Sequence, residues 1–144
     1  MWIMEISGSQ TMFMQMTHIQ IVAFYGALQL VLATMILLSV MVARVKSRVS
    51  IGDGGDENLI KAMRVQANFV ENVPMVMIGL VLLGLLQVSV YTLHGFGALF
   101  FISRLPHFLG MGLGVFPPGR NLGSALNQLT LVATIIALFS AIFL

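Results

Sequence analysis

The stretch 61–74 places ionisable and amide side chains directly before the apolar run 75–86, in a chain where only 8% of residues are charged. A charged side chain that faces lipid costs at least about 2.5–3.5 kcal/mol at the bilayer centre. On an α-helix, four of these side chains fall within an arc of roughly 80° and share one narrow face: Lys61, Arg64, Asn68 and Glu71. This face therefore has to contact other helices or a polar cavity.

The composition is typical of a polytopic membrane protein. Hydrophobic residues make up 58% of the 144 positions, and the mean hydropathy is +0.99. A soluble domain of this size could not bury so much apolar surface. Because one span takes about 20 helical residues, we expect a single all-α membrane domain over residues 1–144, a four-helix bundle. The expected transmembrane helices are 19–43, 59–86, 93–111 and 122–143.

Basic residues predict the orientation of these spans. Three basic residues directly follow the first span: Arg44, Lys46 and Arg48. Lys61 and Arg64 come just after the next loop. The positive-inside rule therefore places the 44–58 loop in the cytoplasm and both termini outside it. The net charge of +2 is small and gives no reason to expect a nucleic-acid partner.

Local signals predict where the helices begin and bend. Asp56 and Asn121 are N-cap residue types, and they predict the starts of the second and fourth helices. Pro74 has no backbone N–H to offer the carbonyl of Val70, so it predicts a kink in the second helix.

In this topology, every span carries polar residues to the cytoplasmic boundary, as a shared pocket requires. These residues are Arg44, Arg64, Asn68, Glu71, Arg104, His107 and Arg120. Their excess of positive charge predicts an anionic ligand, because arginine forks suit carboxylates and phosphates. Glu71 either pairs with Arg64 or Arg104 or holds an ammonium group of the ligand. A small zwitterion with more than one carboxylate satisfies all of these groups.

The absence of cysteine excludes disulfides, a cysteine nucleophile and thiolate metal sites, and no metal site is expected. Catalysis in such a pocket would lower the pKa of a bound thiol or hydroxyl with an arginine. Structural interpretations stay open. The polar face can act as a clasp between helices, His107 can be a packing residue, and Arg120 can anchor the chain at lipid headgroups.

The pattern Arg64-x-Gln66-x-Asn68-Phe69-x-Glu71-x-x-Pro74, followed by Arg104-x-x-His107 and Arg120, resembles the MAPEG family, the membrane-associated proteins in eicosanoid and glutathione metabolism. The similarity covers residues 44–129 and is strongest to bacterial members. It implies a homotrimer in a bacterial inner membrane, with glutathione bound between protomers near the cytoplasmic face. It also implies conjugation of glutathione to lipophilic electrophiles from the bilayer, or peroxide reduction.

The resemblance also implies roles for single residues. Arg120 stands where the prostaglandin synthase branch has an arginine near the glutathione sulfur, so it is the implied catalytic residue. Two family tyrosines are replaced by Met111 and Ser124, so the thiolate would depend on Arg120 or on backbone groups. The implied glutathione-binding residues are Arg44, Arg64, Asn68, Glu71, Arg104, His107 and Asn121.

Two other classes of function stay open. The missing tyrosines favour a non-catalytic membrane protein that binds glutathione or lipid. A small four-span drug exporter would need a lone carboxylate in an uncharged site, and the arginines near Glu71 disfavour it because they repel a cationic drug.

Overall fold

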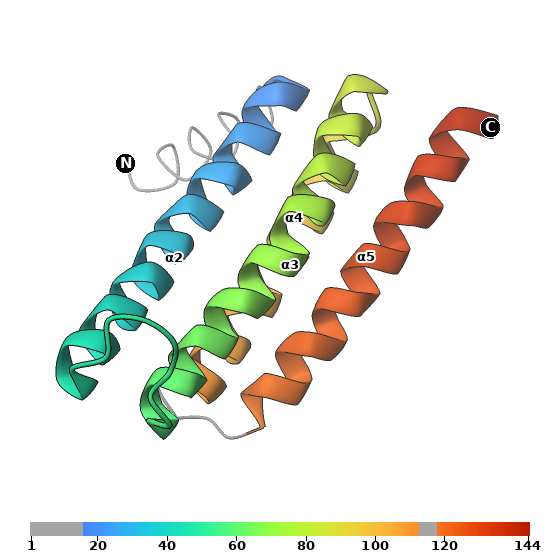
Figure 1. The fold of residues 1–144 in the computed structure, drawn as a ribbon. Helices are drawn as coiled ribbons and strands as arrows, with labels where there is room; N and C mark the ends of the chain where they lie inside the picture. The colour runs from blue at the N-terminus through green and yellow to red at the C-terminus, as the bar shows by residue number, and fades with distance from the viewer. Residues whose placement is uncertain (1–15, 113–117) are drawn as a thin grey trace, which may run out of the picture.

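The computed structural model describes residues 16–112 and 118–144. In these ranges the chain is all-α, with a π-helical turn, Phe108–Gly112, directly after the third helix. Successive helices run in opposite directions, and Figure 1 shows the α2–α3 loop and the start of α5 at the same end of the bundle. The described ranges contain four α-helices: α2 (His18–Ser47), α3 (Glu57–Leu85), α4 (Val90–His107) and α5 (Gly119–Phe143).

The expected all-α fold with four helices is confirmed, and three of the helices are long and apolar enough to cross a membrane: α2, α3 and α5. α4 has 18 residues and is shorter than the predicted third span, because the chain turns π-helical at Phe108. Its polar residues, among them His94, Arg104 and His107, lower its mean hydropathy.

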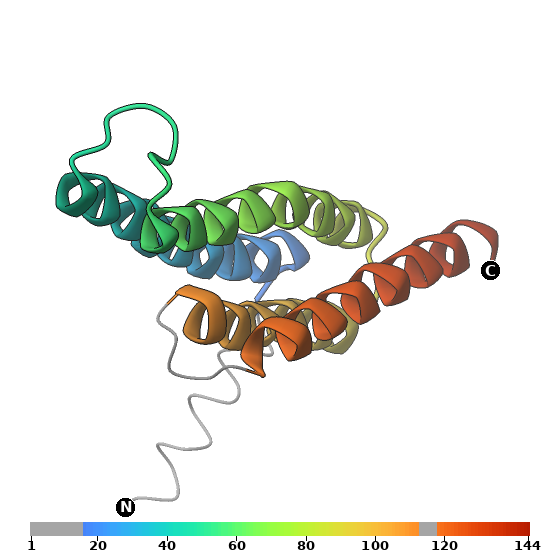
Figure 2. The same ribbon diagram turned by 60° about the horizontal axis from the view of Figure 1, so that its bottom comes forward.

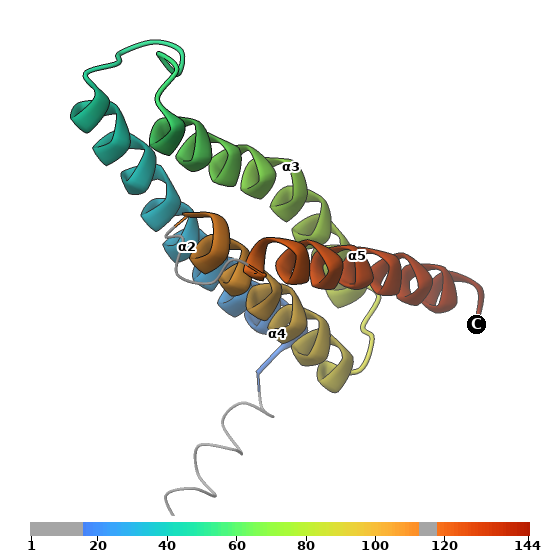
Figure 3. The same cartoon turned by 90° about the horizontal axis from the view of Figure 1, so that it is seen from below.

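The helices form two hairpins packed against each other. α2 lies along α3, α4 lies along α5, and α3 also contacts α5, as Figures 2 and 3 show from two further directions. Side chains between the hairpins are fully buried, for example Ile21, Leu83 and Phe100. Large apolar side chains such as Leu30, Met75 and Ile136 are exposed, which suits a surface that faces lipid.

The helix starts agree with the sequence signals at α3 but not at α5. Asp56 caps α3, because its Oδ1 accepts a hydrogen bond from the backbone N–H of Leu59 at 2.8 Å. The prediction that Asn121 caps the fourth helix was wrong, since the N-cap is Pro118 and Asn121 lies in the first turn. Proline fixes φ near its helical value and has no N–H to satisfy, so the helix begins earlier.

α3 continues without interruption through Pro74. The lost hydrogen bond to the Val70 carbonyl therefore does not end the helix. As a result, the polar first half and the apolar second half of α3 belong to one element, which carries its polar side chains to the end of the bundle where α4 stops and α5 starts.

Candidate functional site

A polar recess of about 130 Å³ lies at the end of the bundle that holds the start of α5. Three helices contribute to its wall, and five of the lining residues are candidates from the sequence. The lining residues are Arg64, Ala67, Asn68, Glu71, His107, Arg120 and Ser124. The fold thus brings together side chains that lie far apart in the sequence.

The α3 side of the recess carries one positive and one negative side chain, both exposed: Arg64 and Glu71. Neither makes a hydrogen bond or an ion pair with any residue that the structure describes. The pairing of Glu71 with Arg64 or Arg104 is therefore not formed. Both charges can instead contact a ligand, with the helical spacing of seven residues keeping them on one face.

Arg104 lies behind the recess and not in its wall. Its side chain is only 3% exposed, and its guanidinium carbon lies 5.3 Å from the centroid of the Phe100 ring. Nη1 donates a hydrogen bond to Oδ1 of Asn68 at 3.2 Å, and Nε donates to Oγ of Ser103 at 3.4 Å. Because Arg104 holds the Asn68 oxygen, the Nδ2 hydrogens of Asn68 are left for an acceptor such as a carboxylate.

Gly123 brings α5 against α4 at the recess. A Cβ atom at this position would lie 2.8 Å from the backbone nitrogen of His107 and 2.8 Å from the carbonyl oxygen of Ser103. Such contacts are too short, so only glycine permits this approach. The close packing places Arg120 and Ser124, on either side of Gly123, beside His107.

The sequence interpretation missed Gly123, although a signal for it exists. Gly119 and Gly123 are four residues apart and both are buried. Small residues at this spacing allow two membrane helices to approach closely.

A ladder of amide side chains joins α3 to α5 below the recess. Nδ2 of Asn127 donates to Oδ1 of Asn72 at 2.8 Å, and Nδ2 of Asn72 donates to the carbonyl oxygen of Asn68 at 2.8 Å. Asn127 is 2% exposed. The sequence interpretation did not single it out, yet an asparagine in the middle of an apolar span is a recognisable signal, since polar groups there need partners.

Two predicted binding residues lie outside the recess. Nη1 of Arg44 donates to the carbonyl oxygens of Gly52 at 2.9 Å and Ser50 at 3.4 Å, so this side chain holds the α2–α3 loop. Asn121 is exposed on the first turn of α5 and does not line the recess. The side chain of Met111 lies outside the described part of the structure.

Lys61 also lies apart from the recess. Its Nζ is 3.6 Å from Oε2 of Glu57, one turn earlier, and its side chain is 57% exposed. The recess therefore holds two cations, Arg64 and Arg120, with the charge of Arg104 behind them. The combined field still favours an anion.

Comparison with known proteins supports the family resemblance. The model of the MAPEG family matches residues 22–140, a range that includes every residue of the recess. The inner membrane protein YecN of Escherichia coli K12 is 28% identical over 88 residues, which cover 61% of this chain and 67% of YecN. YecN of Escherichia coli O6:H1 matches with the same figures. No solved structure matches the chain.

Proposed function

The chain belongs to the MAPEG family, and on this premise we propose that it is a membrane-bound glutathione transferase or peroxidase-like enzyme that conjugates glutathione to lipophilic electrophiles. The observation that carries the proposal is the meeting of Arg64, Glu71 and Arg120 at one recess. Among the described residues, none of the three pairs with another charged side chain.

The charges of the recess complement those of glutathione. The tripeptide carries two carboxylates, one ammonium group and a thiol. Arg64 offers a guanidinium fork to a carboxylate, Glu71 offers a carboxylate to the ammonium group, and Asn68 offers amide hydrogens. Arg120 supplies a second guanidinium, which we assign to the sulfur.

The volume of the recess supports a site completed by a second protomer. Pockets that bury most of a small ligand measure at least about 300 Å³, whereas this recess measures about 130 Å³. One protomer therefore holds only part of the tripeptide, and the rest contacts a neighbour. The proposal accordingly includes a homotrimer with glutathione between protomers.

The chemistry assigned to Arg120 is thiolate stabilisation. A nearby cation favours the ionised form of a thiol, and the thiol proton leaves to water. The sulfur electron pair then forms a bond to the electrophilic carbon, and the leaving group departs with the electrons of the broken bond. The lipophilic electrophile arrives from the bilayer, which the exposed apolar faces of α2, α3 and α5 contact.

We place the chain in a bacterial inner membrane, with the 44–58 loop in the cytoplasm. The basic residues around this loop support the orientation, and the similar protein YecN is named as an inner membrane protein.

A non-catalytic glutathione-binding protein is the second candidate. The residue that favours it is Ser124, which lines the recess at a position where the family has a tyrosine. A serine hydroxyl donates one hydrogen bond but is a weaker acid than a phenol, so it stabilises a thiolate less.

The test is stopped-flow absorbance in the thiolate band, with detergent-purified protein mixed with glutathione. The wild type should give a thiolate signal, Arg120→Ala should lose it while still binding glutathione, and Arg64→Ala should bind more weakly. Binding without a thiolate signal in the wild type indicates the second candidate. If glutathione does not bind at all, both candidates are wrong and the recess serves another ligand.

A further inference from the structure

A second cavity lies at the end of the bundle where α2 ends and α3 begins, beside the loop that joins these two helices (Figure 1). It measures about 280 Å³, and charged, polar and apolar side chains line it together. We call it the terminal cavity. Its polar lining residues are Ser39, Lys46, Ser47, Asp56 and Asn58, and Val42 is among the apolar ones.

Two opposite charges line the terminal cavity without pairing with each other. Lys46 is exposed, and the one ion pair among the described residues joins Lys61 to Glu57 instead. The Asp56 carboxylate uses Oδ1 to cap α3, where it accepts the backbone N–H of Leu59 at 2.8 Å, and no described residue donates to its Oδ2. A ligand with one anionic and one cationic group can therefore contact both side chains.

A serine and an asparagine add neutral contacts to these charges. Oγ of Ser47 donates to the backbone carbonyls of Ala43 at 3.0 Å and Arg44 at 3.3 Å, so its lone pairs are left to accept a hydrogen bond. The amide of Asn58 is exposed and makes no hydrogen bond with the described residues. Its Nδ2 hydrogens suit a phosphate oxygen, whereas Ser47 suits an N–H donor.

An apolar stripe of α2 continues from the terminal cavity toward the middle of the span. Its four residues fall within an arc of roughly 60° on the helix, and each is at least 50% exposed: Val31, Met35, Leu38 and Val42. Lys46 follows Val42 one turn later. The stripe is about 16 Å long, close to the roughly 15 Å of hydrocarbon in one leaflet. The cavity and the stripe therefore follow each other in the order of a phospholipid, headgroup first and acyl chain next.

We propose that the terminal cavity binds the headgroup of a phospholipid that carries a phosphate and a primary ammonium group, with one acyl chain along the stripe. Lys46 and Asn58 contact the phosphate, and Asp56 and Ser47 contact the ammonium group. A headgroup without a cation leaves Asp56 without a partner, and a quaternary ammonium group has no N–H to donate. The site therefore selects phosphoethanolamine over phosphoglycerol and phosphocholine.

The terminal cavity is separate from the polar recess, although α3 contributes to both. Ala62 lines the cavity, and Arg64 lines the recess. Two residues this far apart point to opposite sides of a helix, because each residue turns by about 100°. The headgroup site uses no residue of the recess, so it is independent of whether the chain binds glutathione.

The test is native mass spectrometry of the full chain in detergent micelles, titrated with three phospholipids that have identical acyl chains: phosphatidylethanolamine, phosphatidylglycerol and phosphatidylcholine. The wild type should bind phosphatidylethanolamine roughly tenfold more tightly than either of the others, the effect of one hydrogen bond between charged groups. A phosphatidylethanolamine with a diazirine in its acyl chain then locates the chain in phosphatidylcholine nanodiscs. Its label should lie on the stripe from Val31 to Val42.

Two variants separate the contacts to the two charged groups. Lys46→Gln removes the cation and should weaken the binding of all three lipids roughly tenfold. Asp56→Asn keeps the cap of α3, because asparagine caps a helix as well as aspartate does. It should remove the preference for phosphatidylethanolamine without weakening the binding of phosphatidylglycerol. The matched controls are Lys61→Gln and Asp53→Asn, which lie outside the cavity and should bind like the wild type.

Three outcomes would overturn the proposal. Equal affinity of the wild type for the three lipids means that the headgroup is not recognised. Equal affinity of Lys46→Gln and Lys61→Gln for phosphatidylethanolamine means that Lys46 does not contact the phosphate. If free phosphoethanolamine competes as strongly as the lipid does, the cavity holds a soluble ligand and the stripe plays no part. None of these results depends on glutathione, so each leaves the proposed function intact.

Discussion

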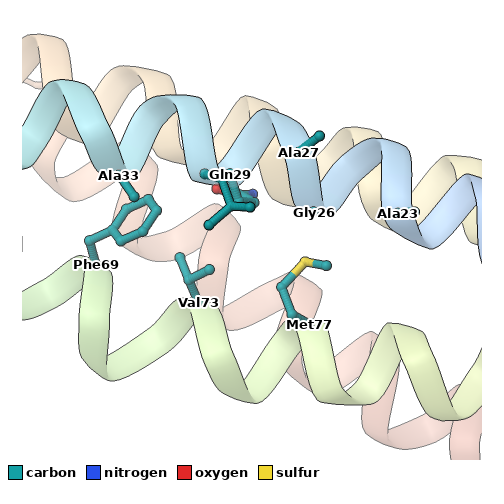
Figure 4. Close-up of a pocket in the computed structure, with 9 residues that line it drawn as sticks. Ala23, Gly26, Ala27, Gln29, Ala33, Phe69, Val73 and Met77 are labelled. Atoms are coloured by element: carbon teal, nitrogen blue, oxygen red, sulfur yellow. The ribbon is translucent and has the colours of Figure 1, made fainter.

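The polar recess and an apolar groove of about 440 Å³ between α2 and α3 (Figure 4), which we call the α2–α3 groove, share α3 but differ in how their walls are held in place. Around the recess, hydrogen bonds tie the helices together, from Arg104 to Asn68 and from Asn127 to Asn72. The groove has no such ties, because its lining is apolar except for Gln29, which lacks a partner among the described residues.

One helix, α3, lines two different environments. Glu71 is exposed at the recess, whereas Val73, two residues later, is buried at the groove. Residues at these positions point to different sides of a helix because each residue turns by about 100°. α3 can therefore present charge to one cavity and apolar surface to the other at similar depth.

The largest effect should come from Gly123→Ala, which attacks the recess alone. The added Cβ would meet the backbone of α4, so α5 must move, and we expect a loss of about 2 kcal/mol in unfolding free energy with weaker glutathione binding. Circular dichroism during denaturation measures the unfolding free energy, and calorimetry measures glutathione binding. Gly95→Ala is the matched control, because nothing lies within 4 Å of a Cβ there. Equal stability of the two variants would contradict the role of Gly123.

Arg64→Ala should come next and should separate binding from stability. Loss of a charge-assisted hydrogen bond is expected to weaken glutathione affinity at least about tenfold. Unfolding should not change, because Arg64 is exposed and its side chain makes no hydrogen bond or ion pair with the described residues. Lys61→Ala is the control, since its partner is Glu57 outside the recess. If both variants bind equally well, the recess is not the site.

A smaller effect is expected from the amide ladder. Asn72→Leu, Asn127→Leu and the double variant form a cycle whose coupling energy should be about 0.6 kcal/mol, the average for hydrogen bonds between membrane helices. The coupling energy is measured from the unfolding free energies of the wild type and the three variants in mixed micelles. A coupling near zero would mean that the ladder does not hold α3 to α5.

The smallest effect should come from Gly26→Ala, the same substitution as at Gly123 but in the groove. Its Cβ would lie 3.4 Å from Cε of Met77, the end of a flexible side chain. We therefore expect a change within about 0.5 kcal/mol of the wild type, with glutathione binding unaltered. If Gly26→Ala lowered the unfolding free energy as much as Gly123→Ala does, the groove would be as tightly packed as the recess, and the proposed difference between them would be wrong.

The recess was largely predictable because charge inside an apolar chain is conspicuous. The spacing of Arg64, Asn68 and Glu71 required one face, and the antiparallel order of the spans brought His107 and Arg120 to the same end. The groove was not predictable, since alanines and glycines of α2 look like any membrane helix. A lone Gln29 gives no sign of whether its partner lies in the same chain.

The amino-acid sequence was sufficient to predict the class of the protein, the four helices, the Asp56 cap and the end of the bundle where charge collects. These depend on composition and on periodicity within one helix, which are local properties. Other positions follow only from how the helices pack: Arg104 lies behind the recess, Arg44 and Lys61 lie outside it, and Gln29 lines a groove. Such facts depend on the distance and rotation between helices, and here a single glycine, Gly123, sets how closely two of them approach.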